Sequence, residues 1–231
     1  MQLADHTFVI SRRVDVERRA RFTAHAKAAG LEDWSFFDAI DGSGGKLATG
    51  TPSAHGRQGR ASPAPLSPGE LGCLLSHMAV WRAALALGMG TVAVLEDDVE
   101  IIEPVLEDDV EIIEPARWPG TRWEAFVAEL PEDWLMVHVG EPVCRSDSVV
   151  ARAEPVQVSP QVSRVGQQYG TWCMVMRPKA LEMLSKAADR AAMSEPADWL
   201  LLGLFATGRV YRPTFGLFQV RDEPGIQQTV T

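Results

Sequence analysis

The chain has 231 residues, which is enough to bury a full hydrophobic core without disulfides or other staples. With 46% hydrophobic and 23% charged residues, the composition is that of a globular protein, and it excludes wholesale disorder and a coiled-coil or collagen-like fibre. A net charge of −9 argues against a general nucleic-acid binder, because such proteins need a basic surface to displace the counterions of phosphates.

The first part of the chain alternates predicted strands with a helix. Apolar runs predict strands over His6–Ser11 and Trp34–Ile40, and apolar or alanine positions at helical spacing predict a helix over residues 14–30 between them. Residues 43–66 are dominated by Gly, Ser, Ala and Pro. We predict a flexible loop there, because such a segment buries too little apolar surface to offset its ordering entropy.

The rest of the chain continues the alternation. Ser67-Pro68-Gly69-Glu70 combines a capping serine, a proline at the first helical position and an early acid, which predicts a helix that runs to about Leu87. The unbroken apolar run Thr91–Leu95 is typical of a strand buried on both faces of a parallel sheet. Later expected elements are an amphipathic stretch near Trp123–Leu130, strands over Trp134–Val139 and Trp172–Met176, and a helix from Lys179 to about Ala192. Strands alternating with helices indicate an α/β protein.

Localisation and redox state follow from what the sequence lacks. No apolar run reaches the roughly eighteen residues that a spanning helix needs, and no basic segment followed by an apolar core opens the chain. We therefore expect a cytoplasmic protein, with at most a peripheral attachment to the inner face of the membrane. Cys73, Cys144 and Cys173 are odd in number and widely spaced, which argues for reduced thiols and against a disulfide framework or a zinc site.

An acidic segment, VLEDDVEIIEP, occurs twice in succession, at residues 94–104 and 105–115. Only one copy can stand at the end of a buried strand. The first copy follows Thr91–Leu95, whereas Glu103 and Pro104 precede the second, and proline cannot donate to a central ladder. We therefore assign the first copy to the strand end and predict an inserted acidic loop or short edge strand for the second.

The acids of the first copy, Glu96, Asp97 and Asp98, suggest a metal site. Open α/β sheets place ligands at the carboxyl ends of their strands. Hard divalent cations bind carboxylate and phosphate oxygens together, so acids at this position can hold Mg²⁺ or Mn²⁺ against a diphosphate. Acid clusters are more often solvated surface, so this motif needs support from its context.

Further motifs, in order along most of the chain, resemble those of glycosyltransferase family 25, which includes lipooligosaccharide and collagen galactosyltransferases. They are FVISRRVDVERRARF, FFDAIDG, LSPGELGCLLSHMAVWRAAL, VAVLEDDVEI, GTWCMVMRPKALEML, EPADWLL and YRPTFGLFQ. The resemblance implies one GT-A-like domain over residues 1–231, of the nucleotide-diphospho-sugar transferase type with a Rossmann-like central sheet. It also implies a UDP-sugar donor such as UDP-galactose, Mn²⁺ or Mg²⁺ as cofactor, and inversion at the anomeric carbon.

The same resemblance assigns roles to individual residues. Asp98 is the first choice as metal ligand and Glu96 the second, while His77 is placed with the catalytic residues. The residues carried over to the donor side are Arg18, Arg19, Glu70, Ser76 and Asp97. For each of these the structural alternative stays open, because a single histidine is often structural and helix arginines are often merely solvated.

Asp198 matches the late aspartate of the family and is our candidate for the base that removes the acceptor proton. An equally good alternative is that Asp198 caps the helix that follows it. The matching closing segment suggests that Tyr211, Pro213 and Gln219 shape the acceptor side. The chain departs from the family at Ser11, where asparagine is usual, and near Leu135, where an aspartate is usual.

The resulting prediction is transfer of a hexose, galactose in the first instance, from a UDP-sugar to a hydroxyl of a saccharide-type acceptor, as in the synthesis of lipopolysaccharide and other surface glycans. The partners are then a nucleotide-sugar and a glycan or glycolipid. Two alternatives remain open. One is another metal-dependent sugar or nucleotidyl transferase, and the other is a non-catalytic nucleotide-sugar-binding member that the acidic duplication has inactivated.

Overall fold

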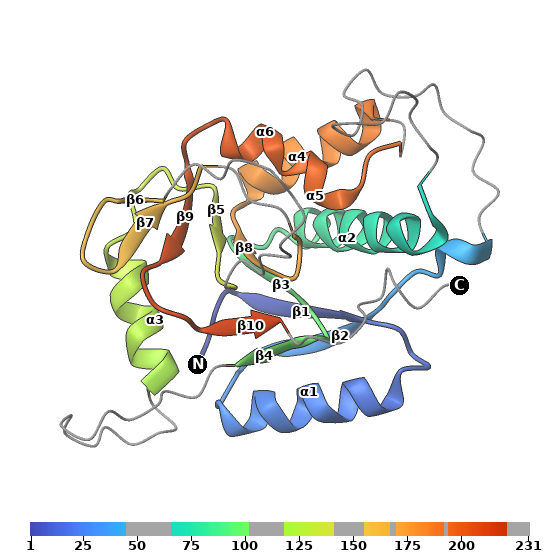
Figure 1. Ribbon diagram of the computed structural model, residues 1–231, viewed down its shortest axis with the longest axis horizontal. Helices are drawn as coiled ribbons and strands as arrows, with labels where there is room; N and C mark the ends of the chain where they lie inside the picture. The colour runs from blue at the N-terminus through green and yellow to red at the C-terminus, as the bar shows by residue number, and fades with distance from the viewer. Residues whose placement is uncertain (45–65, 102–117, 141–154, 167–169, 192–193, 221–231) are drawn as a thin grey trace.

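An eight-stranded mixed sheet runs through the protein in the order β2-β1-β3-β8-β5-β9-β7-β6 (Figure 1). The computed structural model describes residues 1–44, 66–101, 118–140, 155–166, 170–191 and 194–220. The strands are β1 His6–Ser11, β2 Trp34–Asp38, β3 Val92–Glu96, β5 Met136–His138, β6 Val156–Gln157, β7 Val162–Arg164, β8 Cys173–Met176 and β9 Val210–Pro213. The predicted α/β class with a central sheet is confirmed.

The strand directions differ from a purely parallel sheet. β1 pairs in parallel with both β2 and β3, but β8 lies antiparallel between β3 and β5. The prediction that the Thr91–Leu95 strand lies in a parallel sheet is therefore right on its β1 side and wrong on its β8 side. The carboxyl ends of β2, β1 and β3 meet at one edge of the sheet, which is the edge where the first acidic motif stands.

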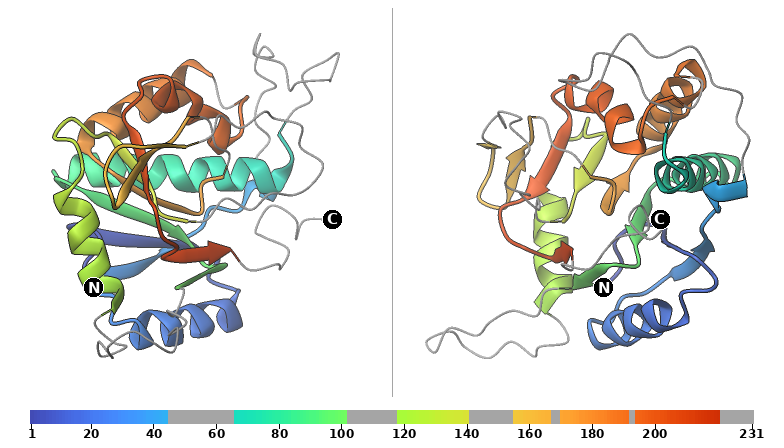
Figure 2. Two further views of the ribbon diagram at one scale, coloured as in Figure 1. Left: turned by 60° about the vertical axis from the view of Figure 1, so that its left-hand side comes forward. Right: turned by 45° about the vertical axis from the view of Figure 1, so that its right-hand side comes forward.

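Helices cover both faces of the sheet, as the two views of Figure 2 show. One face carries α2 Pro68–Ala86, α4 Pro178–Arg190, α5 Ala197–Leu200 and α6 Leu202–Phe205, and the other carries α1 Val16–Ala28 and α3 Trp118–Ala128. Two buried clusters correspond to the two faces. The first holds Leu74 and Trp81 of α2, and the second holds Phe22 of α1 and Phe126 of α3.

Helix α2 begins as its sequence predicts. The Ser67 hydroxyl accepts from the backbone N–H of Glu70, and the Glu70 carboxylate accepts from the backbone N–H of Ser67, which is a complete capping box. Glycine is required where the helix start meets the segment after β2, because a Cβ on Gly72 would lie 2.6 Å from the carbonyl oxygen of Ile40. These contacts fix α2 against the end of β2.

A separate two-stranded sheet pairs β4 Val99–Ile101 with β10 Phe218–Val220. It joins the closing segment of the chain to the residues that directly follow the first acidic motif. A short 3-10 helix covers Gly42–Gly44, but the rest of the predicted loop at 43–66 falls almost wholly outside the described residues, and the second acidic copy at 105–115 falls wholly outside them. Among the described helices, none is both long and apolar enough to cross a bilayer.

Candidate active site

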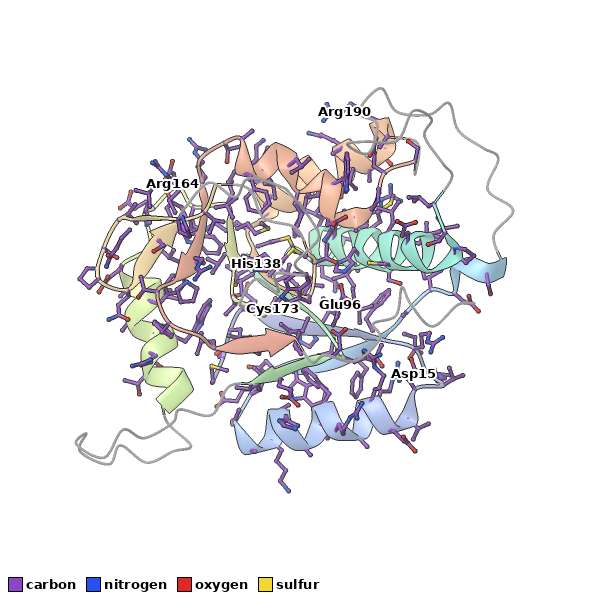
Figure 3. The ribbon with its side chains drawn as sticks, viewed as in Figure 1. Asp15, Glu96, His138, Arg164, Cys173 and Arg190 are labelled. Atoms are coloured by element: carbon purple, nitrogen blue, oxygen red, sulfur yellow. The ribbon has the colours of Figure 1, made fainter. Side chains whose placement is uncertain are left out.

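The three acids of the first copy leave the sheet in different directions. Glu96 is the last residue of β3 and pairs with Ile10, while Asp97 and Asp98 form the turn into β4. Glu96 faces the α2 side, where it contacts His77, and Asp97 faces the α1 side, where it contacts Arg18. Glu96 lies near the centre of the molecule, beneath α2 in the view of Figure 3. The first copy therefore occupies the strand end, as predicted.

Asp97 is held by groups from β1 and α1. The Ser11 hydroxyl donates to Asp97 Oδ2 at 2.6 Å, and Arg18 Nη2 lies 2.6 Å from Asp97 Oδ1. Burial raises the pKa of Asp97, although both partners act to lower it. The contacts on both of its oxygens make Asp97 an anchor for the turn, and they leave it a poor direct ligand for an added ion.

Asp98 has fewer partners. Its Oδ2 lies 3.6 Å from Arg18 Nη2, and its Oδ1 is buried without a hydrogen-bond partner within the part of the chain that the structure describes. Burial, followed by repulsion from Glu96, raises the pKa of Asp98 to about 7. A buried carboxylate with an unmatched oxygen and a neighbouring like charge is what a divalent cation would stabilise.

Glu96 is bound by His77 of α2 and by Thr171, which lies shortly before β8. Its Oε1 lies 3.2 Å from Nε2 of His77 and accepts a 2.7 Å hydrogen bond from the Thr171 hydroxyl. Burial acts to raise the pKa of Glu96, but these two hydrogen bonds and the charges of His77 and Arg18 outweigh burial and lower it. Glu96 is thus held as a carboxylate beside Asp98, which suits a shared cation.

Asp198 is brought to the same region from the far end of the chain. It stands in the first turn of α5, whose N-cap is Pro196, so the alternative that Asp198 caps this helix is wrong. Burial and the charges of Glu70 and Glu96 raise the pKa of Asp198 to about 6. A carboxylate that loses its proton near pH 6 suits a general base at neutral pH.

Two of the candidate donor contacts lie elsewhere. Arg19 binds the carbonyl oxygen of Ser11 and the carboxylate of Asp38, and its guanidinium stacks over the ring of Phe36, so it braces the ends of β1 and β2. The buried Ser76 hydroxyl accepts from the backbone of Ile40 and donates to that of Gly72. Both side chains therefore support the scaffold, and neither contacts the carboxylate cluster of Glu96, Asp98 and Asp198.

The departures from the family pattern have different consequences. Ser11 keeps a polar contact, because its hydroxyl binds Asp97 directly. The Leu135 side chain makes no polar contact, because it is buried in the apolar core.

The residues of the closing motif lie on two different strands. Tyr211 and Pro213 lie in β9 and pair with β7, whereas Gln219 lies in β10 opposite Glu100 of β4. The closing motif thus divides between the main sheet and the strand beside the acidic turn, and its acceptor role stays a prediction.

The sequence did not single out Thr171. This residue binds Glu96 and also lies 3.8 Å from the Cys73 sulfur, so it links β3 to α2. Its motif, GTWCMVM, was part of the family resemblance. Only the antiparallel pairing of β8 with β3 brings Thr171 to the acid, and that pairing is not readable from local sequence.

Comparison with known proteins decides the family. A model of glycosyltransferase family 25, described as LPS biosynthesis protein, matches residues 4–194. The chain belongs to this family. The match includes the three acids of the first copy and His77, and it ends just before Asp198.

Individual relatives within family 25 are similar over shorter stretches. The chain is 35% identical over 98 residues to a "Glycosyltransferase 25 family member" of Aedes aegypti, covering 41% of this chain and 16% of that protein. It is also 35% identical over 99 residues to the "Inactive glycosyltransferase 25 family member 3" of Homo sapiens, again 41% of this chain and 16% of that protein. The match thus spans less than a fifth of these relatives' own length.

A solved structure, that of a glycosyltransferase involved in the glycosylation of the major capsid of PBCV-1, can be superposed with a TM-score of 0.48. The sequence identity is 9%, and the superposition covers 96% of this chain and 95% of that one.

Proposed function

We propose that this family 25 chain transfers a hexose, galactose in the first instance, from a UDP-sugar to a hydroxyl of a saccharide-type acceptor, with inversion and with the help of a divalent cation. The observation that carries the proposal is the carboxylate cluster at the end of β3. Glu96 lies close enough to Asp98 for its charge to raise the pKa of Asp98. The positive charge of Arg18 acts in the opposite direction and lowers the pKa of both carboxyl groups. Such a site has negative charge in excess.

The residues of the cluster fit a hard divalent cation. Asp98 Oδ1 has no hydrogen-bond partner among the residues described, and both Glu96 and Asp98 offer the carboxylate oxygens that Mn²⁺ and Mg²⁺ prefer. When bound, the cation would neutralise charge on the departing diphosphate. Arg18, paired with Asp97, orients the turn that carries Asp98 and adds positive charge on the same side.

Asp198 is proposed to accept the proton of the attacking hydroxyl. Its pKa of about 6 leaves it ionised at neutral pH, yet basic enough to take a proton in the transition state. Glu70, fixed by the capping box of α2, contributes to that raised pKa through its charge. Glu70 is therefore proposed to tune Asp198, which is a more specific role than donor binding. His77 is likewise given a supporting role, because its contact with Glu96 would hold that carboxylate in position.

A product assay tests the proposed function. Full-length chain is incubated with a panel of UDP-sugars, simple saccharide acceptors and Mn²⁺, and released UDP and pyrophosphate are measured separately together with the glycoside. We expect UDP and glycoside in equal amounts. Pyrophosphate in place of UDP would instead identify a nucleotidyl transferase on the same sheet.

The non-catalytic alternative has one supporting observation, namely that the similar human protein is itself named inactive. Titration calorimetry with the same UDP-sugars, in the presence and absence of Mn²⁺, separates the two cases. Donor binding without UDP release across the whole acceptor panel would favour a nucleotide-sugar-binding role. Turnover with any donor would exclude it.

A further inference from the structure

A second set of metal-ligating side chains lies against the carboxylate cluster, on its α2 side. Cys73 and His77 stand one helical turn apart on α2, and Glu96 reaches them from the end of β3. One ligand atom from each residue lies within 4.8 Å of the other two. His77 Nε2 and Glu96 Oε1 are 3.2 Å apart, close to the roughly 3.4 Å between neighbouring ligands of a tetrahedral site with bonds of about 2.0–2.3 Å.

The surroundings of this trio favour a cation. His77 is fully buried, Cys73 is 5% exposed, and the Glu96 side chain is 13% exposed, so all three side chains are largely shielded from bulk water. The charge of Glu96 acts on both Asp98 and Asp198, so two further carboxylates lie near the trio.

The ligand types point to a particular class of ion. Thiolate and imidazole are the ligands that zinc and cobalt prefer, whereas magnesium and manganese prefer the oxygens offered by Asp98 and Glu96. The Thr171 hydroxyl borders the same space, at 3.8 Å from the Cys73 sulfur and 2.7 Å from Glu96 Oε1. A water molecule near this hydroxyl could complete four-coordination.

We propose that Cys73, His77 and Glu96 form a binding site for a thiophilic divalent cation, typified by Zn²⁺, separate from the Asp98 site but sharing Glu96 with it. Binding releases the thiol proton of Cys73 to solvent. The proton that His77 Nε2 shares with Glu96 also leaves that nitrogen, so that His77 binds as a neutral imidazole protonated at Nδ1, and bonds to the ion replace the His77–Glu96 hydrogen bond. The wide spacing of the cysteines argues only against sites built from cysteine pairs. This site instead takes one ligand atom from each of three different residue types, namely a thiolate, an imidazole and a carboxylate.

The shared Glu96 has a consequence for activity, and this consequence rests on the proposed function. An ion held by Cys73 and His77 would draw the Glu96 carboxylate toward α2 and away from the cation at Asp98. Zinc at low concentration should therefore inhibit Mn²⁺-dependent transfer, and Cys73→Ser should relieve that inhibition.

The experiment uses Co²⁺ as a spectroscopic probe of the full-length chain, because a cobalt–thiolate bond gives an intense near-ultraviolet charge-transfer band. We expect one equivalent of Co²⁺ to produce this band, and Zn²⁺ to remove it by displacement. Cys73→Ser should abolish the band and weaken Zn²⁺ binding by more than about 100-fold, since even outer-shell changes cost 10- to 100-fold. Cys173→Ser removes another buried thiol outside the trio and should keep the band.

Zinc X-ray absorption on the unmutated chain provides a test that needs no variant. We expect one sulfur scatterer at about 2.3 Å together with nitrogen and oxygen. A shell of oxygen and nitrogen alone, or a cobalt band that survives in a folded Cys73→Ser variant, would overturn the site. If the chain shows the cobalt band but no sugar transfer with any donor, the proposed function fails while the metal site stands.

Discussion

Arg18 Nη2 lies 2.6 Å from Asp97 Oδ1 and 3.6 Å from Asp98 Oδ2, so one guanidinium from α1 serves two adjacent acids at the end of β3. The Asp97 side chain is completely buried and that of Arg18 is 14% exposed. Removing Arg18 would therefore take away the positive charge that offsets two buried carboxylates, Asp97 and Asp98, beside the candidate metal site.

We expect Arg18→Ala to lower the free energy of unfolding by about 3 kcal/mol, the usual cost of leaving a buried charge without its partner. Urea unfolding followed by circular dichroism measures the change. Arg13→Ala is the matched control, because the Arg13–Asp38 pair lies at the surface and should contribute little. Equal effects of the two substitutions would show that the Arg18 pair is no more important than a surface pair.

The pKa of Asp98 predicts how stability depends on pH when no divalent cation is present. Burial raises this pKa from 3.8 to about 7, so between these values the folded chain keeps a proton that the unfolded chain has lost. The contribution of Asp98 to stability therefore falls as pH rises from about 4 to about 7, by at most about 1.4 kcal/mol per pH unit.

Asp98→Asn mimics the protonated form and should remove this contribution. Unfolding of wild type and variant in EDTA, between pH 4 and pH 8, gives the difference directly. The variant should become more stable relative to wild type as pH rises. A constant difference would mean that Asp98 titrates normally in the folded chain. With Mn²⁺ the trend should reverse, because the ion competes with the proton and binds more tightly at higher pH.

Asp198 predicts the pH profile of the transfer reaction. If it is the general base, kcat should rise with pH through about 6 as the carboxyl loses its proton. Asp198→Asn should lower kcat by about 10²- to 10⁴-fold and remove this limb of the profile. Asp189→Asn, at an exposed acid paired with Arg82, is the control and should leave the profile unchanged. An unaltered limb in Asp198→Asn would assign the base elsewhere.

Gly170 is expected to be intolerant of substitution. Its φ is +106°, and an added Cβ would lie 1.5 Å from Cζ3 of Trp172. Gly170→Ala should therefore destabilise the chain by about 2 kcal/mol or more and displace the neighbouring Thr171 from Glu96. In contrast, an added Cβ at the exposed Gly203 of α6 meets nothing within 4 Å, so Gly203→Ala should stabilise by about 0.5 kcal/mol. Thermal melting of both variants tests the contrast, and a neutral Gly170→Ala would contradict it.

The elements that sequence predicts well are those determined by local chemistry. The Ser67–Glu70 box fixes the start of α2, and the apolar run before Glu96 fixes β3 and the position of the first acidic copy. The sequence does not predict the edge strand β6 or its short neighbour β7. Val156 and Gln157 of β6 are both exposed, so no burial pattern distinguishes them.

The candidate site was only partly predictable, because long-range packing decides which side chains meet. The sequence placed Ser76 and His77 together, but on the helix Ser76 turns toward Ile40 and His77 toward Glu96. Arg18 and Arg19 separate in the same way. Asp198 and Thr171 reach the acids through α5 and β8, whose positions depend on the whole sheet.

The most direct test of the account is UDP release with Mn²⁺ and with EDTA, for wild type, Asp98→Asn and Asp109→Asn. Asp109 is the equivalent acid of the second copy, so this variant makes the same chemical change eleven residues further along the chain. We predict turnover that is lost in EDTA, lost in Asp98→Asn and retained in Asp109→Asn. Turnover that survives both EDTA and Asp98→Asn would contradict the central claim that Asp98 holds a metal needed for sugar transfer.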